Sequence, residues 1–317
     1  MNYIVLDLEW NQCPEGKIKE NSRIPFEIIE IGAIRFQFSS HDLSDSFCSL
    51  IKPSVYPSLH HKTREVISLR STDFENAEDF PAVARKFFSW CGEEPSFCTW
   101  GPADLTELQR NMAYYGMPLP FPFPFFYYDI QKIFSIVYED RKTRRSLEYA
   151  VDFLKIEKEI PFHDALSDAY YTARVMERLT EDQLLSNSSI DCFRTPEKRK
   201  DEIHVTYGTY SKYISKPFSS KQQAMKDRAV TSTSCYLCGK STPKKIRWFS
   251  AGSSNYFCLS FCESHGYLKG KIRLRQRQDG SFYAIKTQKL ISPEEAYAIR
   301  EKKEIHSLKR RLRKKYQ

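Results

Sequence analysis

Charge is distributed unevenly along this chain of 317 residues, and the division constrains the fold more than any other feature of the sequence. Residues 1–190 contain 20 Lys and Arg against 29 Asp and Glu, a net charge of −9. Residues 191–317 contain 29 against 11, a net charge of +18. At about 150 residues per domain the length also corresponds to two domains. We therefore expect an acidic domain suited to metal cations and a basic domain suited to a polyanion. The alternative is that two domains differ only in surface charge.

Composition excludes several classes of protein. With 41% hydrophobic and 28% charged residues the chain is typical of globular proteins rather than disordered ones. No run of about 20 apolar residues could form a membrane span, and the longest uncharged run, 111–128, contains four prolines. The N-terminus carries Asp7 and Glu9 and lacks the basic start of a signal peptide. We expect a cytoplasmic protein without membrane contact, whose nine cysteines are thiols or metal ligands.

Strand and helix patterns alternate in residues 1–190, which predicts a domain of the α/β class. Short apolar runs indicate strands and longer amphipathic segments indicate helices. The expected strands are 3–6, 28–34, 47–51 and 97–100, and the expected helices are 103–115, 146–154 and 165–179.

The basic part falls into three segments. Residues 191–232 are polar, interleave tyrosines with lysines and show no sustained apolar period, so we interpret them as a linker. Residues 233–290 hold four of the nine cysteines and predict a compact β module. In 291–317, Ser292 is a helix N-cap, Pro293 follows, and Glu295 completes a capping box. A helix is therefore expected to run into the basic end, 309–315.

Three acidic residues stand beside the predicted strands. Asp7 and Glu9 lie two apart and share a face of the strand end, where open α/β sheets place their ligand crevices. A divalent cation between them would relieve their repulsion; alone, the pair is also compatible with a solvated strand end. Asp104 follows the fourth strand at the start of a helix, a position that the helix dipole by itself favours.

His163 and Asp168 form the fourth motif. Two residues that are five positions apart on a helix point in directions about 140° apart, so His163 and Asp168 cannot share one helix face. We expect His163 on a loop, Asp164 at the N-cap and Asp168 in the first turns of the helix. A lone histidine on a loop is also commonly structural or simply exposed.

In this order and context, the motifs resemble the DEDDh 3′→5′ exonuclease superfamily, which includes RNase T and the proofreading subunit of bacterial replicase. Asp7-Leu8-Glu9, the strand 27–33, Asp104 and His163-x4-Asp168 carry the resemblance, which covers about residues 1–185. It implies an RNase H-like α/β domain, with a mixed sheet flanked by helices. Trp100-Gly101 and Asp129-Ile130 further resemble the branch that trims RNA 3′ ends.

The resemblance also implies the chemistry. Two divalent cations stabilise the attacking and leaving oxygens of a phosphodiester, and oxygen ligands suit Mg²⁺ or Mn²⁺. His163 is implied as the general base that takes a proton from the attacking water. The substrate would be the 3′ end of single-stranded nucleic acid, with RNA favoured over DNA by the resemblance alone. The implied ligands of the catalytic cations are Asp7, Glu9, Asp104 and Asp168.

Asp129 is open to two interpretations. It could be a further site residue, or it could cap the helix expected at 130–136.

The cysteines of the β module have the spacing of a structural zinc site. Cys235-x2-Cys238 is followed by a glycine, and Cys262-x2-His265 comes after a short interval. We expect these four residues to bind Zn²⁺, which would stabilise a module with a small core. Cys258 could replace one member of the second pair or be a buried strand thiol, and the absence of any metal is the remaining alternative.

A basic strand follows the cysteines. The alternation in 271–277 places four cations on one face, where a phosphate backbone could bind, although a solvated outer face is the other interpretation. Asp279-Gly280 indicates a hairpin turn to the next strand. These cations are Lys271, Arg273, Arg275 and Arg277.

Two functions from different classes are compatible with these patterns. The first is a metal-dependent 3′→5′ exonuclease whose basic domain helps to bind the substrate. The second is a nucleic-acid-binding adaptor that holds strand ends without turnover. The complete carboxylate and histidine set favours the enzyme; the sequence says nothing about oligomeric state.

Overall fold

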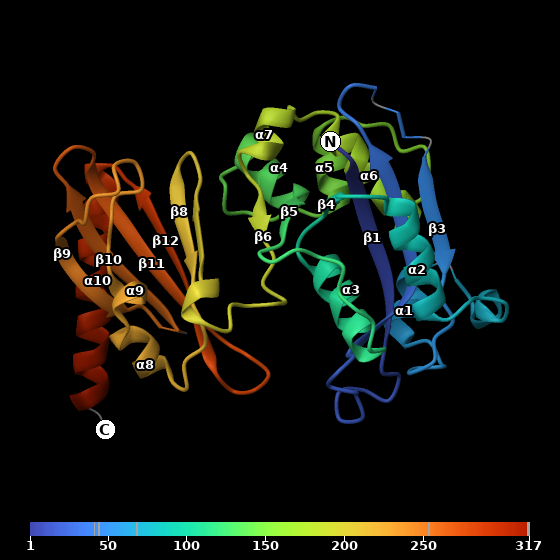
Figure 1. Ribbon diagram of the computed structural model, residues 1–317, viewed down its shortest axis with the longest axis horizontal. Helices are drawn as coiled ribbons and strands as arrows, with labels where there is room; N and C mark the ends of the chain where they lie inside the picture. Colours follow the sequence, from blue (N-terminus) through green and yellow to red (C-terminus); the bar gives the residue numbers. More distant parts are fainter. Residues whose placement is uncertain (41, 44, 68, 253, 316–317) are drawn as a thin grey trace. The chain divides into compact units, whose positions relative to one another are not determined.

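The computed structural model describes residues 1–40, 42–43, 45–67, 69–252 and 254–315. The chain forms two compact units, Met1–Phe193 and Arg194–Gln317, so the structural boundary lies close to the charge boundary (Figure 1).

A mixed sheet of six strands forms the centre of the first unit, in the order β3-β2-β1-β4-β5-β6. The pairs β1–β2, β2–β3 and β5–β6 are antiparallel, whereas β4 is parallel to both β1 and β5. The strands are β1 (Tyr3–Gln12), β2 (Phe26–Phe36), β3 (Ser46–Leu50), β4 (Ser96–Thr99), β5 (Phe126–Asp129) and β6 (Ser189–Ile190).

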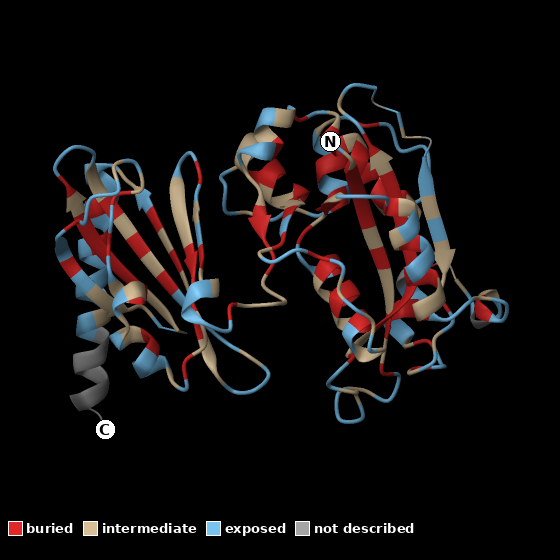
Figure 2. Ribbon diagram, viewed as in Figure 1, coloured by how far each residue is buried: buried red, intermediate tan, exposed pale blue. Residues whose placement is uncertain are grey.

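Helices cover both faces of this sheet (Figure 1). On one face, α4, α5 and α6 share a buried apolar cluster with Tyr3 and Val5, and on the other, α2 and α3 pack on Ile4 and Leu6. Figure 2 shows this buried interior in red between the exposed outer surfaces of the helices. The helices of the unit are α1 (His61–Val66), α2 (Phe80–Cys91), α3 (Ala103–Tyr114), α4 (Ile130–Tyr138), α5 (Leu147–Phe153), α6 (Ala165–Met176) and α7 (Glu181–Leu185).

The predicted α/β class, with a mixed sheet flanked by helices, is confirmed. Each of the seven elements expected from periodicity corresponds to a strand or helix. The largest difference is β1, which continues to Gln12 instead of ending near Leu6. The added residues Asp7–Gln12 are more polar, but they pair with β2, with one shift of register between Glu9 and Trp10. Pairing rather than apolarity therefore determines the length of the strand.

The second unit contains an antiparallel sheet in the order β7-β8-β12-β11-β10-β9. Helices α8 (Lys221–Lys226) and α9 (Arg228–Thr231) pack on one face, where Ala224 and Val230 join a buried cluster with Ile272. The predicted hairpin is present as β11–β12. The strands are β7 (Ile203–Thr206), β8 (Tyr210–Ile214), β9 (Lys244–Ser250), β10 (Asn255–Cys262), β11 (Gly266–Gln276) and β12 (Phe282–Leu290).

The expectation of a linker over 191–232 is corrected by this sheet. Strand β8 pairs with β12 and β7 pairs with β8, so the segment from Arg194 onward is an integral part of the second unit. Its apolar anchors Tyr213, Phe218, Ala224 and Val230 are widely spaced among polar residues. They therefore produce no periodic pattern in the sequence.

The predicted C-terminal helix is present as α10 (Pro293–Lys315). Its capping box forms as expected: the Glu295 N–H donates to Ser292 Oγ over 3.2 Å, and the Ser292 N–H donates to a Glu295 carboxylate oxygen over 3.4 Å. Ala296 and Ile299 pack on Ile246 and Leu259 of the sheet. The basic side chains of 309–315 and residues 316–317 lie outside the described part of the structure.

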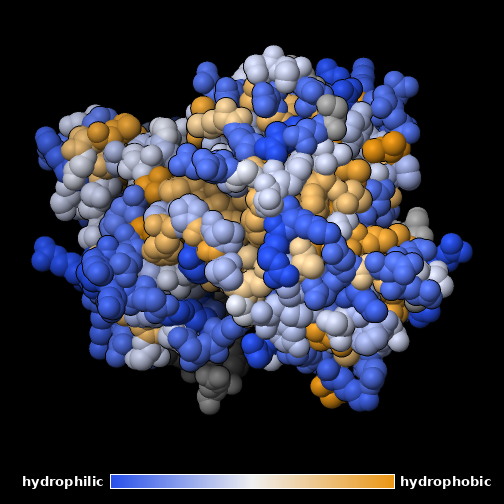
Figure 3. Space-filling model, turned by 45° about the vertical axis from the view of Figure 1, so that its right-hand side comes forward, coloured by the Kyte–Doolittle hydropathy of each residue, from blue (hydrophilic) through white to orange (hydrophobic). Residues whose placement is uncertain are grey.

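Among the described residues, no helix is both long and apolar enough to cross a membrane. Hydrophilic side chains cover most of the face drawn in Figure 3, and apolar ones are scattered between them.

Candidate active site and cysteine cluster

Asp7 and Glu9 lie where β1 extends beyond its parallel neighbour. Pairing of β1 with β4 ends at Val5 opposite Cys98, whereas pairing with β2 continues to Gln12. In that overhang Asp7 lies opposite Gly32 of β2, and Glu9 lies opposite Glu30. The two carboxylates are therefore on one face of a strand that is paired along one edge only.

Helix α6 brings a third carboxylate to the same place. Asp164 is its N-cap, as predicted, and accepts the Ser167 N–H over 2.9 Å. One turn later, a carboxylate oxygen of Asp168 lies within 4.8 Å of oxygens of both Asp7 and Glu9. The structure thus brings together residues from β1 and α6 that are far apart in the sequence.

A glycine makes this approach possible. A Cβ atom on Gly32 would lie 2.1 Å from the carbonyl carbon of Ala165 and 2.2 Å from the Leu166 nitrogen, both backbone atoms of α6. No side chain fits in that space. Gly32 therefore determines how close the start of α6, and with it Asp168, lies to β1.

Asp104 completes the acidic group from the first turn of α3, where it is 5% exposed. Burial raises its pKa to about 7, although interactions with the backbone N–H groups of Asp104 itself and of Leu8 lower it. It stands outside the group of three that lies within 4.8 Å. Nevertheless, it is the charge that most raises the pKa of Asp7.

Burial and mutual repulsion raise the pKa values of these carboxyl groups, and the charge of His163, which lowers the pKa of Asp168, does not outweigh them. Burial raises the pKa of Asp7 well above its ordinary value, and Asp104 and Asp168 raise it further. Burial, then Asp168 and Glu30, raise the pKa of Glu9 to about 8. Burial also raises the pKa of Asp168. No lysine or arginine among the described residues is among the largest causes of these pKa shifts. A set of closely spaced carboxylate oxygens of this kind fits a hard divalent cation.

Glu30 belongs to this site, although it is not among the residues predicted from the sequence. It is 5% exposed and accepts the Ala165 N–H over 3.3 Å and the Cys48 thiol over 3.6 Å. It therefore links β2 to the start of α6 and adds negative charge beside Glu9. The signal was its position two residues before Gly32, on the same face of a strand.

His163 and Asp129 differ in how they relate to the carboxylates. His163 is exposed on the loop before α6, with φ of +71°, and its backbone N–H donates to Asp168 Oδ1 over 3.4 Å. Asp129 is the N-cap of α4 and accepts the Lys132 N–H over 2.8 Å, which is the second of its two interpretations.

The cysteine cluster forms in the second unit as the spacing predicted. Ligand atoms of Cys235, Cys238, Cys262 and His265 all lie within 4.8 Å of one another. The Cys238 and Cys262 sulfurs are 3.7 Å apart, and His265 Nδ1 is 3.5 Å from Cys235 Sγ. Three thiols and one imidazole fit a tetrahedral zinc ion. Cys258 stays outside this group, fully buried in β10 beneath Gly270.

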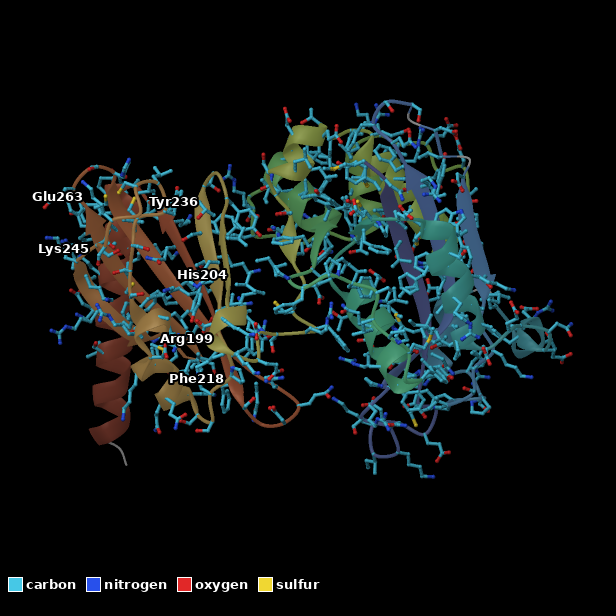
Figure 4. The ribbon with its side chains drawn as sticks, in the orientation of Figure 1. Arg199, His204, Phe218, Tyr236, Lys245 and Glu263 are labelled. Atoms are coloured by element: carbon cyan, nitrogen blue, oxygen red, sulfur yellow. The ribbon has the colours of Figure 1, made fainter. Side chains whose placement is uncertain are left out.

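Two similar turns present these ligands. The Gly239 N–H donates to Cys235 O over 2.8 Å, and the His265 N–H donates to Cys262 O over 3.3 Å. Gly239 and Gly266, directly after each pair, have φ of +72° and +92°, a conformation that favours glycine. Figure 4 labels one residue from each turn, Tyr236 and Glu263, at the same end of the sheet. Gly266 is thus a second signal of the site in the sequence, equivalent to Gly239 after the first pair.

The basic strand separates into two parts. Arg273 and Arg275 are exposed on β11, while Ile272 and Leu274 between them are buried, as the alternation predicted. Lys271 is half-buried, with its ammonium 6.0 Å from the centre of the Phe257 ring. Arg277 lies beyond the end of β11 and forms ion pairs with Glu197 and, over 3.8 Å, with Asp279.

The comparison with protein families concerns the first unit. A family model described as RNase_T, exonuclease, matches residues 4–176. The nuclease domain of 3′hExo, a DEDDh family member bound to rAMP, is 19% identical with a TM-score of 0.51, covering 60% of this chain and 96% of that one. A full-length 3′-exonuclease is also 19% identical with a TM-score of 0.50, covering 58% and 83%. Structural similarity at 19% sequence identity shows that the folds are alike. No curated protein sequence matches the chain.

Proposed function

The chain belongs to the RNase T exonuclease family, and from this premise we propose that it removes nucleotides from the 3′ end of single-stranded nucleic acid in a reaction that depends on divalent metal ions. The observation that carries the proposal is the group of Asp7, Glu9 and Asp168, whose oxygens lie within 4.8 Å of one another and whose pKa values are all raised.

We assign the metal ligands to Asp7, Glu9, Asp104 and Asp168. Two Mg²⁺ or Mn²⁺ ions would stabilise the charge that develops on the attacking and leaving oxygens. Asp104 is buried in the first turn of α3, where its carboxylate interacts with the Leu8 N–H. Glu30 supports the arrangement through its hydrogen bond to the start of α6.

We assign His163 the role of general base. Its imidazole would take a proton from the attacking water, whose oxygen bonds to phosphorus as the bond to the 3′ oxygen of the preceding nucleotide breaks, releasing a nucleoside 5′-monophosphate. Two observations support this role. The backbone of His163 contacts Asp168, and its left-handed conformation is uncommon for a residue with a side chain.

The second unit is proposed to bind the same strand. The support is the +18 charge of residues 191–317 and the exposed pair Arg273 and Arg275. The cysteine cluster fits a zinc ion, and zinc bound there would stabilise the fold of this unit, because metal binding and folding are linked. Replacing both arginines with serine should reduce the slope of log affinity against log salt by about 1.4 for a single strand.

The decisive experiment compares end-labelled single-stranded RNA and DNA side by side with Mg²⁺ or Mn²⁺. We expect mononucleotides to appear from the 3′ end, and RNA to be degraded faster, on the strength of the Trp100-Gly101 and Asp129-Ile130 resemblance. EDTA and Asp7→Ala should abolish the reaction, and a 3′-phosphate should block it while a 5′-phosphate does not.

Two outcomes would contradict the proposal. Cleavage of a circular single strand would exclude an exonuclease, because a circle has no end. Tight binding without any release of nucleotides would identify an adaptor that holds strand ends.

A further inference from the structure

A cluster of cations stands out in the otherwise acidic first unit. Arg141, Lys142, Arg144 and Arg145 occupy four of five consecutive positions in the loop that joins α4 to α5. They are four of only 20 lysines and arginines in residues 1–190, where 29 acidic residues outnumber them. The function assigned so far does not use this loop.

The fold places the loop at the edge of the sheet that carries the acidic site. Pairing of the parallel strands β1 and β4 ends at Val5 and Cys98, and Trp100 follows β4 directly, at the end of the sheet where β1 continues to Asp7. The indole N–H of Trp100 donates to the carbonyl oxygen of Arg145 over 3.1 Å. Gln131, at the start of α4, donates to the same oxygen over 2.9 Å. These two hydrogen bonds hold the loop next to the ends of β4 and β5. Helix α3, which carries Asp104, begins shortly after β4.

The loop also lies on the side of the sheet where Asp168 is found. Trp100 packs against the apolar cluster that α4, α5 and α6 share, with its ring 6.0 Å from that of Phe134. Helix α5, which begins directly after the loop, packs on α6. Arg144 is near enough to Asp129, the N-cap of α4, to lower its pKa.

One cation of the loop contacts other side chains of the protein, and the other three are exposed without an ion pair among the described residues. Arg145 forms an ion pair with Glu139 over 3.1 Å, and its guanidinium lies 4.4 Å from the centre of the Tyr149 ring. Arg141, Lys142 and Arg144 are exposed, and within the described residues none of them forms an ion pair. The backbone that carries them is ordered, because Asp140 Oδ1 accepts the N–H groups of Lys142 and Thr143 over 2.8 and 2.7 Å.

We propose that this loop is a phosphate-binding subsite of the catalytic unit, in which Lys142 and Arg144, with Arg141, bind the backbone of the single strand whose 3′ end enters the acidic site. This inference rests on the proposed exonuclease function. A polyanion approaching a cluster of carboxylates is repelled, and cations beside the cluster offset that repulsion and steer the strand. The same arrangement requires no base contact, so the subsite binds all sequences alike.

The test removes two cations from the loop and two from elsewhere on the same unit. Lys142→Ser/Arg144→Ser is compared with Lys52→Ser/Arg85→Ser, a control with the same change in charge at exposed positions outside the loop. The ratio of kcat/KM for a strand of about 15 nucleotides to that for a dinucleotide should fall about tenfold in the loop variant at low salt and stay at the wild-type value in the control. The loss should appear in KM and diminish as salt is raised.

Binding is measured independently of turnover, by fluorescence anisotropy with a labelled strand blocked at its 3′ end. The loop variant should reduce the slope of log affinity against log salt by about 1.4, the value for two phosphate contacts on a single strand. An unchanged slope, or equal losses in both variants, would overturn the subsite. Failure of the exonuclease proposal looks different: the wild-type protein then releases no nucleotide, while the anisotropy experiment still tests the loop.

Discussion

At the scale of single residues, the site is defined by closely spaced carboxyl groups whose pKa values are raised, first by burial and then by mutual repulsion. A folded pKa raised above the unfolded value of about 4 means that the folded, metal-free protein binds protons more tightly than the unfolded chain. The stability that follows is present at acid pH and is lost as pH rises through the folded values, about 7 for Asp104 and about 8 for Glu9.

We therefore predict that the melting temperature of the chelated protein falls between about pH 4 and pH 8. Mn²⁺ should raise it more at pH 8 than at pH 5, because the metal offsets repulsion only between ionised carboxylates. Asp7→Asn should raise the melting temperature of the chelated protein at pH 8 by a few degrees. Differential scanning fluorimetry in EDTA and in Mn²⁺ makes the measurement, and a melting temperature in EDTA that is flat from pH 5 to pH 8 would contradict it.

For His163 the prediction concerns the pH profile. A general base must be neutral to accept a proton, so the wild-type rate should rise with pH and level off. His163→Ala should lose about 10²–10⁴-fold in kcat and lose the rising limb, while its affinity for Mn²⁺ is retained. Near-full turnover with the wild-type profile would mean that the exposed imidazole has no part in the reaction.

The site residues that could be predicted owe their signal to the local sequence, whereas the others owe their role to contacts with distant parts of the chain. Asp7, Glu9 and Asp168 stand out because charged residues beside apolar runs interrupt a pattern. Glu30 and Gly32 lie inside an apolar strand, and their roles come from contacts with Ala165, far away along the chain. A single sequence contains no record of such a contact.

At the scale of elements, the approach of α6 to β2 is the contact on which the site depends. We predict that Gly32→Ala costs about 1–3 kcal/mol of stability, because a methyl group 2.1 Å from backbone atoms forces the helix away. The shift moves Asp168, so affinity for Mn²⁺ and activity should fall together.

Gly208→Ala is the matched control for this substitution, since no atom lies within 4 Å of the added methyl group. Its stability, measured by urea unfolding, should be close to that of the wild type. Equal stability and metal affinity for both variants would show that α6 adjusts without consequence.

Regular periodicity led to most of the predicted elements, although α2, whose buried Phe80, Val83 and Phe87 have helical spacing, was missed. Elements held by isolated contacts were not predicted. The apolar stripes of α3 and α6 are visible in the sequence, whereas β7 and β8 depend on pairing with β12, which is distant along the chain. Pairing between strands follows from tertiary structure, so the interpretation of this segment as a linker was wrong.

At the scale of the whole molecule, two separate cores imply two separate responses to metal. We predict that wild-type protein contains one zinc ion per chain and that Cys235→Ser loses it, with loss of order in the second unit only. Cys258→Ala should keep the zinc, because its sulfur is buried in β10 outside the cluster.

Elemental analysis and far-ultraviolet circular dichroism make this measurement, and dinucleotide cleavage reports on the first unit. Cys235→Ser should retain that cleavage. Zinc retained in Cys235→Ser, or lost in Cys258→Ala, would show that a different set of ligands binds the metal.

The overhang of β1 beyond β4 has a consequence for the exchange of backbone hydrogens with solvent. Along this edge the pairing of β1 with β4 ends at Val5, and the Leu8 N–H interacts instead with the Asp104 carboxylate. The acidic site thus occupies the position that a longer fourth strand would have filled. In Asp104→Ala the Leu8 amide should exchange with deuterium many-fold faster, while the amides of residues 3–5, which lie in the part of β1 paired with β4, keep their protection.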